Sequence, residues 1–174
     1  MYVGHLGIAL GGKGLRRDAP LWLLVLATQG PDWVQVVACS TGTSAHAMWS
    51  HSIPAVLVLA AAMALASYTV TRDGGVSGLA AAVTLSHVLV DYVTGIKPTW
   101  PGGPMVGLHL YAHPGWDFLL ETGMIAAGWW VYRGTLAPEL RSSPLARALL
   151  VVLIITQALG ALKLAIAPPA TKCF

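Results

Sequence analysis

The chain has 174 residues, of which 56% are hydrophobic and only 10% are charged. A soluble domain of this length carries roughly a quarter charged residues, so the composition excludes the ordinary soluble class and indicates a membrane protein. The formal net charge is +3, but no basic patch is interleaved with aromatic residues. We therefore expect no nucleic-acid partner, and we read the lysines and arginines as flanks of membrane segments.

The apolar segments predict a helical bundle. The first of them, residues 2–12, is too short to cross a bilayer and predicts a short N-terminal helix tucked into the bundle. Further segments have about the 20 residues that a crossing needs; they are residues 19–38, 53–71, 76–94, 117–132 and 145–166. A Gly-Pro-Asp triplet at 30–32 interrupts the first of these, which a membrane helix tolerates when neighbouring groups satisfy its backbone. With no internal repeat visible, the sequence predicts one all-α membrane-embedded domain over residues 1–174, with about five transmembrane helices.

Basic residues predict the orientation of this bundle. If all the long segments span, most lysines and arginines lie on one side, which the positive-inside rule makes cytoplasmic; they are Lys13, Arg16, Arg17, Arg72, Arg133, Arg141 and Arg147. The opposite side receives Lys97 and Lys172, with Lys163 near that end of the last helix. The loops 39–52 and 95–116 are therefore expected to be extracytoplasmic, in a multi-pass protein of the inner or plasma membrane.

Most of the remaining ionisable residues gather toward that extracytoplasmic side. Its half of the bundle receives carboxylates within or at the ends of apolar segments, together with histidines; the residues are Asp32, His51, His87, Asp91, Asp117 and Glu121. A carboxylate at membrane depth is costly and usually marks a function or a buried pair. Carboxylates without a cation repel one another, whereas a bound divalent metal supplies positive charge and takes imidazole and carboxylate as ligands.

The spacing of these residues supports a metal site. His87 and Asp91 are four residues apart and so lie on one helix face, and Asp117 and Glu121 repeat this spacing on the next long helix. We expect two adjacent antiparallel helices to present these four side chains to one cavity, as carboxylate-rich helix pairs do in dinuclear metal bundles.

Other interpretations of the same residues remain open. The pair His87–Asp91 is also consistent with a structural ion pair, and the polar row with the pathway of a transporter or another ion-handling membrane protein. A non-catalytic factor stabilised by metal is a third interpretation. The loop histidines His46 and His109 are secondary ligand candidates, and a disulfide between Cys39 and Cys173 is left open.

Several motifs together resemble a known family. MYVGHLGIAL at the start, QGPDW at 29–33, WSHSI at 49–53 and SHVLVDYVTG at 86–95 are similar to those of the bacterial and archaeal membrane-bound metal-dependent hydrolases. The resemblance covers about residues 1–122. The order of histidines and acidic residues also resembles, more faintly, that of the zinc-dependent phospholipase C and single-strand nuclease superfamily, which is all-helical and trinuclear.

The resemblance implies site residues and chemistry. It implies metal-ligand roles for a first set of residues, namely His5, Asp32, His51, His87 and Asp91. It suggests a second set in which His113, or His109, joins Asp117 and Glu121. Family members often carry an arginine where this chain has Ala47, and the phospholipase pattern has HxxxE where this chain has DxxxE.

The expected activity combines both lines of argument. We expect a metal-dependent hydrolase of a lipid or another amphiphilic phosphoester, with membrane lipids as its surroundings. The divalent metal is expected to be Zn²⁺, in one to three ions, with Mn²⁺ or Fe as alternatives. Asp32, next to Pro31, is the candidate for a bridging ligand or general base.

Overall fold

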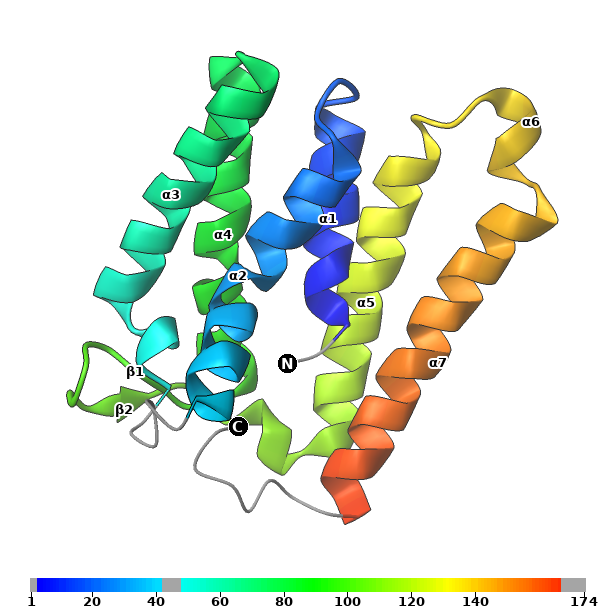
Figure 1. Cartoon of the computed structure of the whole chain (residues 1–174). Coiled ribbons are helices and arrows are strands. Elements are labelled where there is room, and N and C mark those ends of the chain that lie inside the picture. The colour runs from blue at the N-terminus through cyan, green and yellow to red at the C-terminus, as the bar shows by residue number, and fades with distance from the viewer. Residues whose placement is uncertain (1–2, 42–47, 167–174) are drawn as a thin grey trace.

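The protein is a bundle of long helices, and the connections between them lie at the two ends of the bundle. The computed structural model describes residues 3–41 and 48–166 (Figure 1). Its helices are α1 Gly4–Leu15, α2 Leu21–Ser40, α3 Ile53–Thr71, α4 Gly74–Thr94, α5 Pro114–Arg133, α6 Pro138–Arg141 and α7 Pro144–Ile166. Single 3-10 turns, η1 Trp49–His51 and η2 Leu110–Ala112, lie in the connections, and the two-residue strands β1 Lys97–Pro98 and β2 Met105–Val106 form an antiparallel ribbon.

The helical class predicted from the sequence is confirmed. The short N-terminal helix and each long apolar segment appear as helices within a few residues of their expected bounds. The expected interruption at 30–32 is milder than the sequence suggests, since α2 continues through Pro31. Proline removes one backbone donor, which a helix tolerates where tertiary packing holds it. The sequence did not predict the ribbon or the short α6.

Three helices meet the length and composition of membrane spans. These are α3, α4 and α7, whose residues are apolar along nearly their whole length. At 20 residues each, α2 and α5 are as long as a span requires. They are not among the candidate spans because they carry the polar residues of the bundle interior, including Asp32 and Glu121. The expectation of five spans is thus supported for three helices.

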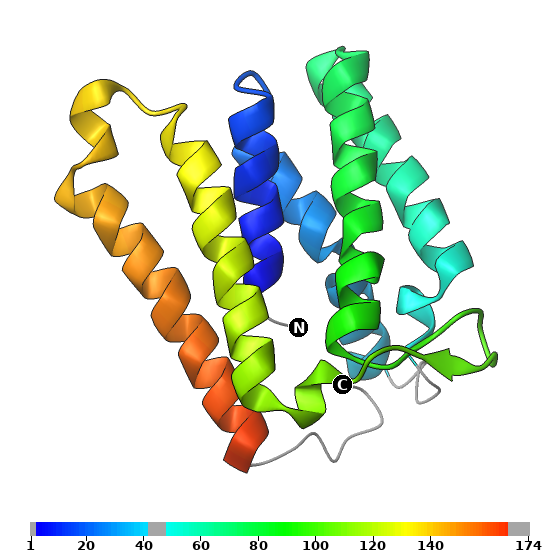
Figure 2. The ribbon, with the colours of Figure 1, turned by 180° about the vertical axis from the view of Figure 1, so that it is seen from behind.

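Helix α1 lies between α4 and α5, and glycines make its close approach to α5 feasible. A Cβ atom added at Gly7 would overlap the backbone carbonyl of Met124, and one added at Gly128 would overlap the carbonyl of Gly7. Small residues permit such backbone contact between membrane helices. Viewed from behind, α1 separates the two longer helices (Figure 2). This packing carries His5 into the centre of the bundle, where it is fully buried.

The two ends of the bundle differ in their connections. At one end, which we call the basic end, lie the turns after α1, α3 and α5, with Arg16, Arg72 and Arg133 in or next to them. At the other end, which we call the site end, η1 leads into α3, and the ribbon and η2 lead from α4 into α5 (Figure 1). The candidate site is built from residues toward this second end.

Candidate metal centre

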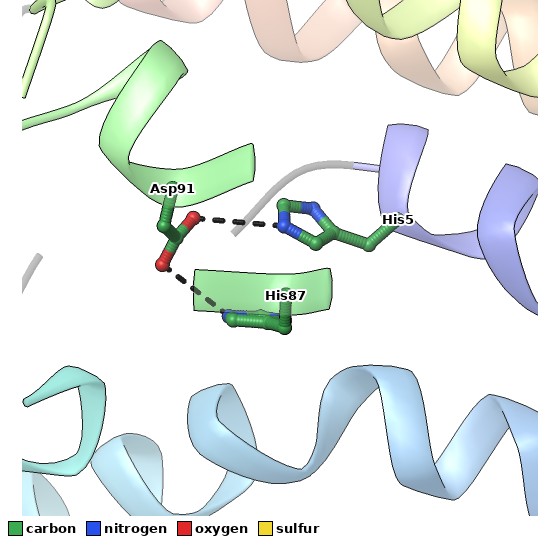
Figure 3. Close-up of side chains that lie close together, drawn as sticks. All are labelled: His5, His87 and Asp91. Atoms are coloured by element: carbon green, nitrogen blue, oxygen red, sulfur yellow. Dashed lines mark ion pairs between the residues drawn. The ribbon is translucent and has the colours of Figure 1, made fainter. Parts of the chain in front are cut away.

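Five of the predicted ligands come together in the interior of the bundle. They are drawn from α1, α2, η1 and α4 and are at most 5% exposed; the residues are His5, Asp32, His51, His87 and Asp91. Figure 3 shows His5 and His87 reaching Asp91 from two different helices. No pair of these elements could form the site alone, so the tertiary packing of α1, α2 and α4 creates it.

Asp91 is the centre of this cluster. Its Oδ2 atom lies 3.3 Å from His87 Nε2 and 3.3 Å from His51 Nε2. Its Oδ1 atom lies 3.6 Å from His5 Nε2 (Figure 3). The two oxygens of one carboxylate thus face imidazoles from three elements.

Asp32 completes the arrangement from α2. Its Oδ1 atom is 3.1 Å from His51 Nε2 and 3.8 Å from His87 Nε2. Ligand atoms at about 2.0–2.1 Å from a tetrahedral Zn²⁺ are separated from one another by about 3.3–3.4 Å. The spacings in the cluster bracket this value, and its donor set of imidazole and carboxylate is one that divalent transition metals accept.

The ring of His87 is oriented by a backbone group. Its Nδ1 atom lies 2.6 Å from the carbonyl oxygen of Thr28. A carbonyl only accepts hydrogen bonds, so Nδ1 carries the proton and donates it. In a neutral ring the proton on Nδ1 leaves a lone pair on Nε2, the nitrogen that faces Asp91 and Asp32. Donation from the second ring nitrogen to a backbone carbonyl is the common support of a metal-binding histidine.

The ring of His51 is oriented by a side-chain relay. Ser50 Oγ donates its single proton to Gln35 Oε1 at 3.0 Å. The same oxygen lies 3.0 Å from His51 Nδ1, and it must accept there because its proton is already used. His51 Nε2 therefore also presents a lone pair toward Asp32 and Asp91.

Two imidazole lone pairs aimed at two carboxylates require a positive charge between them. A second proton on the ring of His87 would supply such a charge; for His51, burial lowers the pKa and favours the neutral ring. Asp91 Oδ2 is paired with the Lys97 ammonium at 3.3 Å, and among the described residues His87 Nε2 has no hydrogen-bond partner. Buried polar atoms are rarely left in this state, and a bound cation would satisfy this one.

Two overlapping groups in this cluster could hold a metal ion. One consists of His5, His87 and Asp91, and the other of Asp32, His51 and His87. In each group the ligand atoms lie within 4.8 Å of one another, and all residues are buried. The metal-binding interpretation of HxxxD thus has the geometry that it needs, and His87 belongs to both groups.

Asp117 and Glu121 lie outside these two groups. Both are fully buried on α5, and the backbone N–H of Gly4 donates to Glu121 Oε2 at 3.3 Å. The expectation that the helices of His87 and of Glu121 are adjacent is wrong, because α1 packs between α4 and α5 (Figure 2). The acidic pair consequently meets the start of α1, through Gly4.

The loop histidines are placed apart from the cluster. His109 and His113 flank η2 and are exposed, and neither belongs to the groups described above. His46, Ala47 and Cys173 lie outside the described residues, so the predictions made for them stay predictions.

Sequence reasoning missed several members of the site. Lys97, on β1, is 3% exposed and places Nζ 3.3 Å from Asp91 Oδ2. The supporting residues Thr28, Gln35 and Ser50 are also buried. A signal existed for Lys97, which is the one cation at the depth of the carboxylates, whereas the supporting residues act through contacts that only the fold creates.

A comparison with protein-family models, with curated proteins and with solved structures finds no match to this chain. The functional argument therefore depends on the geometry of the site.

Proposed function

We propose that this protein is a membrane-embedded metal-dependent hydrolase that acts on a lipid or another amphiphilic phosphoester. One observation carries the proposal: the Nε2 atoms of His51 and His87 converge on Asp32 and Asp91 in a buried cluster. The motif resemblance to membrane-bound metal-dependent hydrolases agrees with this chemistry. The first choice of metal is Zn²⁺, with Mn²⁺ or Fe as alternatives.

The residues present have distinct roles in such a site. A divalent metal held there would lower the pKa of a water ligand toward about 7 and so supply a nucleophile. The imidazoles of His51 and His87, oriented by Ser50 and by the carbonyl of Thr28, would hold the metal, with Asp91 as a further ligand. Asp32 has one oxygen toward His51, while its Oδ2 atom has no hydrogen-bond partner in the described chain. This free, buried oxygen is suited to accept a proton from the attacking water, which is the general-base role.

The proposal includes five membrane crossings, with α2 and α5 added to the three apolar helices. Their polar residues face the interior, while their outward side chains include Trp22, Leu26 and Val37 on α2 and Leu119 and Trp130 on α5. An apolar outer face is what lipid contact requires. The basic end would then be cytoplasmic and the site end extracytoplasmic. Labelling of single cysteines placed at positions 44 and 137 tests this orientation. Labelling of position 137 from outside the cell would show that the basic end is extracytoplasmic.

A non-catalytic, metal-stabilised membrane protein is the second candidate. The complete burial of His5, His51 and His87 favours it, because a catalytic site must admit substrate. Turnover on a panel of phosphodiester lipids separates the two candidates. Absence of stoichiometric metal from the wild type would favour a transporter that uses the same polar row as a pathway.

Metal content with its stoichiometry is the deciding experiment. The protein is purified in detergent without chelator, and bound metal is measured by elemental analysis for the wild type, His87→Ala and Asp91→Ala. Asp18→Asn, which changes a carboxylate at the basic end, is the matched control. We expect stoichiometric metal in the wild type and the control, and loss in both site variants. A wild type without metal would overturn the proposal.

A further inference from the structure

We infer that the cluster holds one divalent cation and that the Lys97 ammonium supplies the second positive charge, binding the anionic oxygen of a phosphoester substrate. This inference rests on the proposed function and assigns a substrate-binding residue to it. It also gives a cation for phosphoester binding in a chain that has alanine at position 47, where members of the family that the motifs resemble often carry an arginine.

The count of ions follows from His87. Both three-residue metal groups use this histidine. Its Nδ1 atom donates to the carbonyl of Thr28, so only Nε2 has a lone pair. One lone pair binds one ion, and the two groups cannot both be filled through the same nitrogen. Asp91 Oδ2 faces His51, His87 and Lys97 at 3.3 Å each.

The position of Lys97 is built by the chain around it. The ribbon of β1 with β2 begins just after Gly95, and Lys97 pairs with Val106 in it. A Cβ atom at Gly95 would lie 3.1 Å from Tyr111 Cε2, which is tighter than ordinary contact, and 3.4 Å from Lys97 Cε, which is ordinary contact. The glycine therefore leaves room for the Tyr111 ring, with the lysine stem in contact distance of the same position. Burying a lysine is costly unless its charge is paired, and the Asp91 carboxylate pairs with it.

The ammonium has donor capacity beyond this contact. An ammonium has three N–H donors. Within the described chain its neighbours are Asp91 Oδ2 and, at 3.8 Å, the sulfur of Met48, which is a weak acceptor. A further oxygen ligand would complete its hydrogen bonding.

The charge balance identifies the class of ligand. Asp32, Asp91 and Lys97 together carry one net negative charge when the imidazoles are neutral. One divalent cation changes this to one net positive charge, which a phosphodiester with its single negative charge would neutralise. The shared chemistry is an anionic phosphoryl oxygen, from a lipid headgroup or from free phosphate.

Cobalt substitution gives a readout that does not depend on turnover. The protein is loaded with Co²⁺, its stoichiometry is measured, and inorganic phosphate is titrated while the visible Co²⁺ absorption is followed. Short-chain phosphatidylglycerol serves as the second ligand, and the ratio of the two affinities identifies the source of the phosphoryl group. The variants are Lys97→Met and Lys97→Arg, and Lys163→Met on α7 is the control for loss of a lysine charge elsewhere.

We expect one Co²⁺ per chain in all four proteins. Phosphate binding should weaken by roughly tenfold or more in Lys97→Met, because one of two cations facing the anion is lost, and should be largely retained in Lys97→Arg and Lys163→Met. Thermal unfolding of each Co²⁺-loaded variant checks that it is folded. Two ions per chain, or equal phosphate affinity in Lys97→Met and the wild type, would overturn the inference while leaving the metal proposal intact. Absence of metal in the wild type would overturn both.

Discussion

The two ends of the bundle both gather ionisable side chains, but they balance charge differently. At the basic end, Arg16 lies 2.8 Å from Asp18 and 2.9 Å from Asp73, with side chains between 37% and 57% exposed. At the site end, Asp32 and Asp91 face imidazoles and one lysine, and all are buried. The first cluster has its cation built in and water around it. The second has more buried negative charge than its own cation neutralises, and this imbalance is the physical reason to expect a bound metal there.

The largest expected effect is that of removing the metal. A ligand that binds only the folded state stabilises it by about 2.7–4.1 kcal/mol when its free concentration is 100 to 1,000 times its Kd. We therefore expect chelation to lower the free energy of unfolding in detergent by about 3–4 kcal/mol. The effect should be equally large in Arg16→Gln, which breaks the basic-end cluster only. If a chelator leaves the unfolding temperature of the wild type unchanged, the site end is not stabilised by a bound metal and does not differ from the basic end in this respect.

The next effect concerns α1, which joins the two ends because it carries His5 near its start and Arg16 just after its last residue. Gly7→Ala should destabilise the protein by about 1–3 kcal/mol, the usual penalty for overpacking, since the added methyl group meets the backbone of Met124. Gly123→Ala on α5 is the matched control, because nothing lies within 4 Å of a Cβ at that position. Thermal unfolding of the two variants measures the difference. Similar unfolding temperatures would show that α1 does not depend on close contact with α5.

A smaller effect is expected from the relay that orients His51. Ser50→Ala removes the oxygen that accepts from His51 Nδ1, and loss of such a supporting contact typically weakens metal affinity 10- to 100-fold. Ser52→Ala is the matched control, because its hydroxyl is buried two residues away and has no hydrogen-bond partner among the described residues. Competition with a chromophoric chelator measures both affinities. Equal losses in the two variants would show that the hydroxyl of Ser50 has no special role.

The sequence predicted the composition of the site better than its assembly. Membrane-depth carboxylates and the i, i+4 spacing of His87 and Asp91 pointed to a metal cluster, and both residues lie in it. Placing the helix of Glu121 next to that of His87 was wrong, because helix order along the chain does not reveal that α1 inserts between α4 and α5. The supporting contacts of Thr28 and Ser50 also depend on tertiary packing. These residues resemble any other small polar residue until a histidine ring is placed against them.

The smallest expected effect is the acid response of the basic end, and its direction follows from the pKa values. The hydrogen bond from Arg16 lowers the pKa of Asp18 to about 2, from an ordinary value of 3.8. Backbone N–H groups at the start of α4, chiefly that of Val76, lower the pKa of Asp73, and Arg16 adds to this. A carboxyl group with a depressed folded-state pKa stabilises the protein above its unfolded pKa, and the contribution disappears as the pH falls through the folded value. The contribution of Asp18 should therefore be complete above about pH 4 and lost between about pH 4 and pH 2. Solvent screens an exposed pair, so the effect should be small and should shrink further in high salt.

Unfolding temperatures of metal-free wild type and Arg16→Gln, measured from about pH 4 to pH 2, isolate the contribution of this pair, because the titration of the buried cluster is common to both proteins. The two curves should converge toward pH 2, and curves that stay parallel would show that Arg16 does not stabilise the ionised carboxylates.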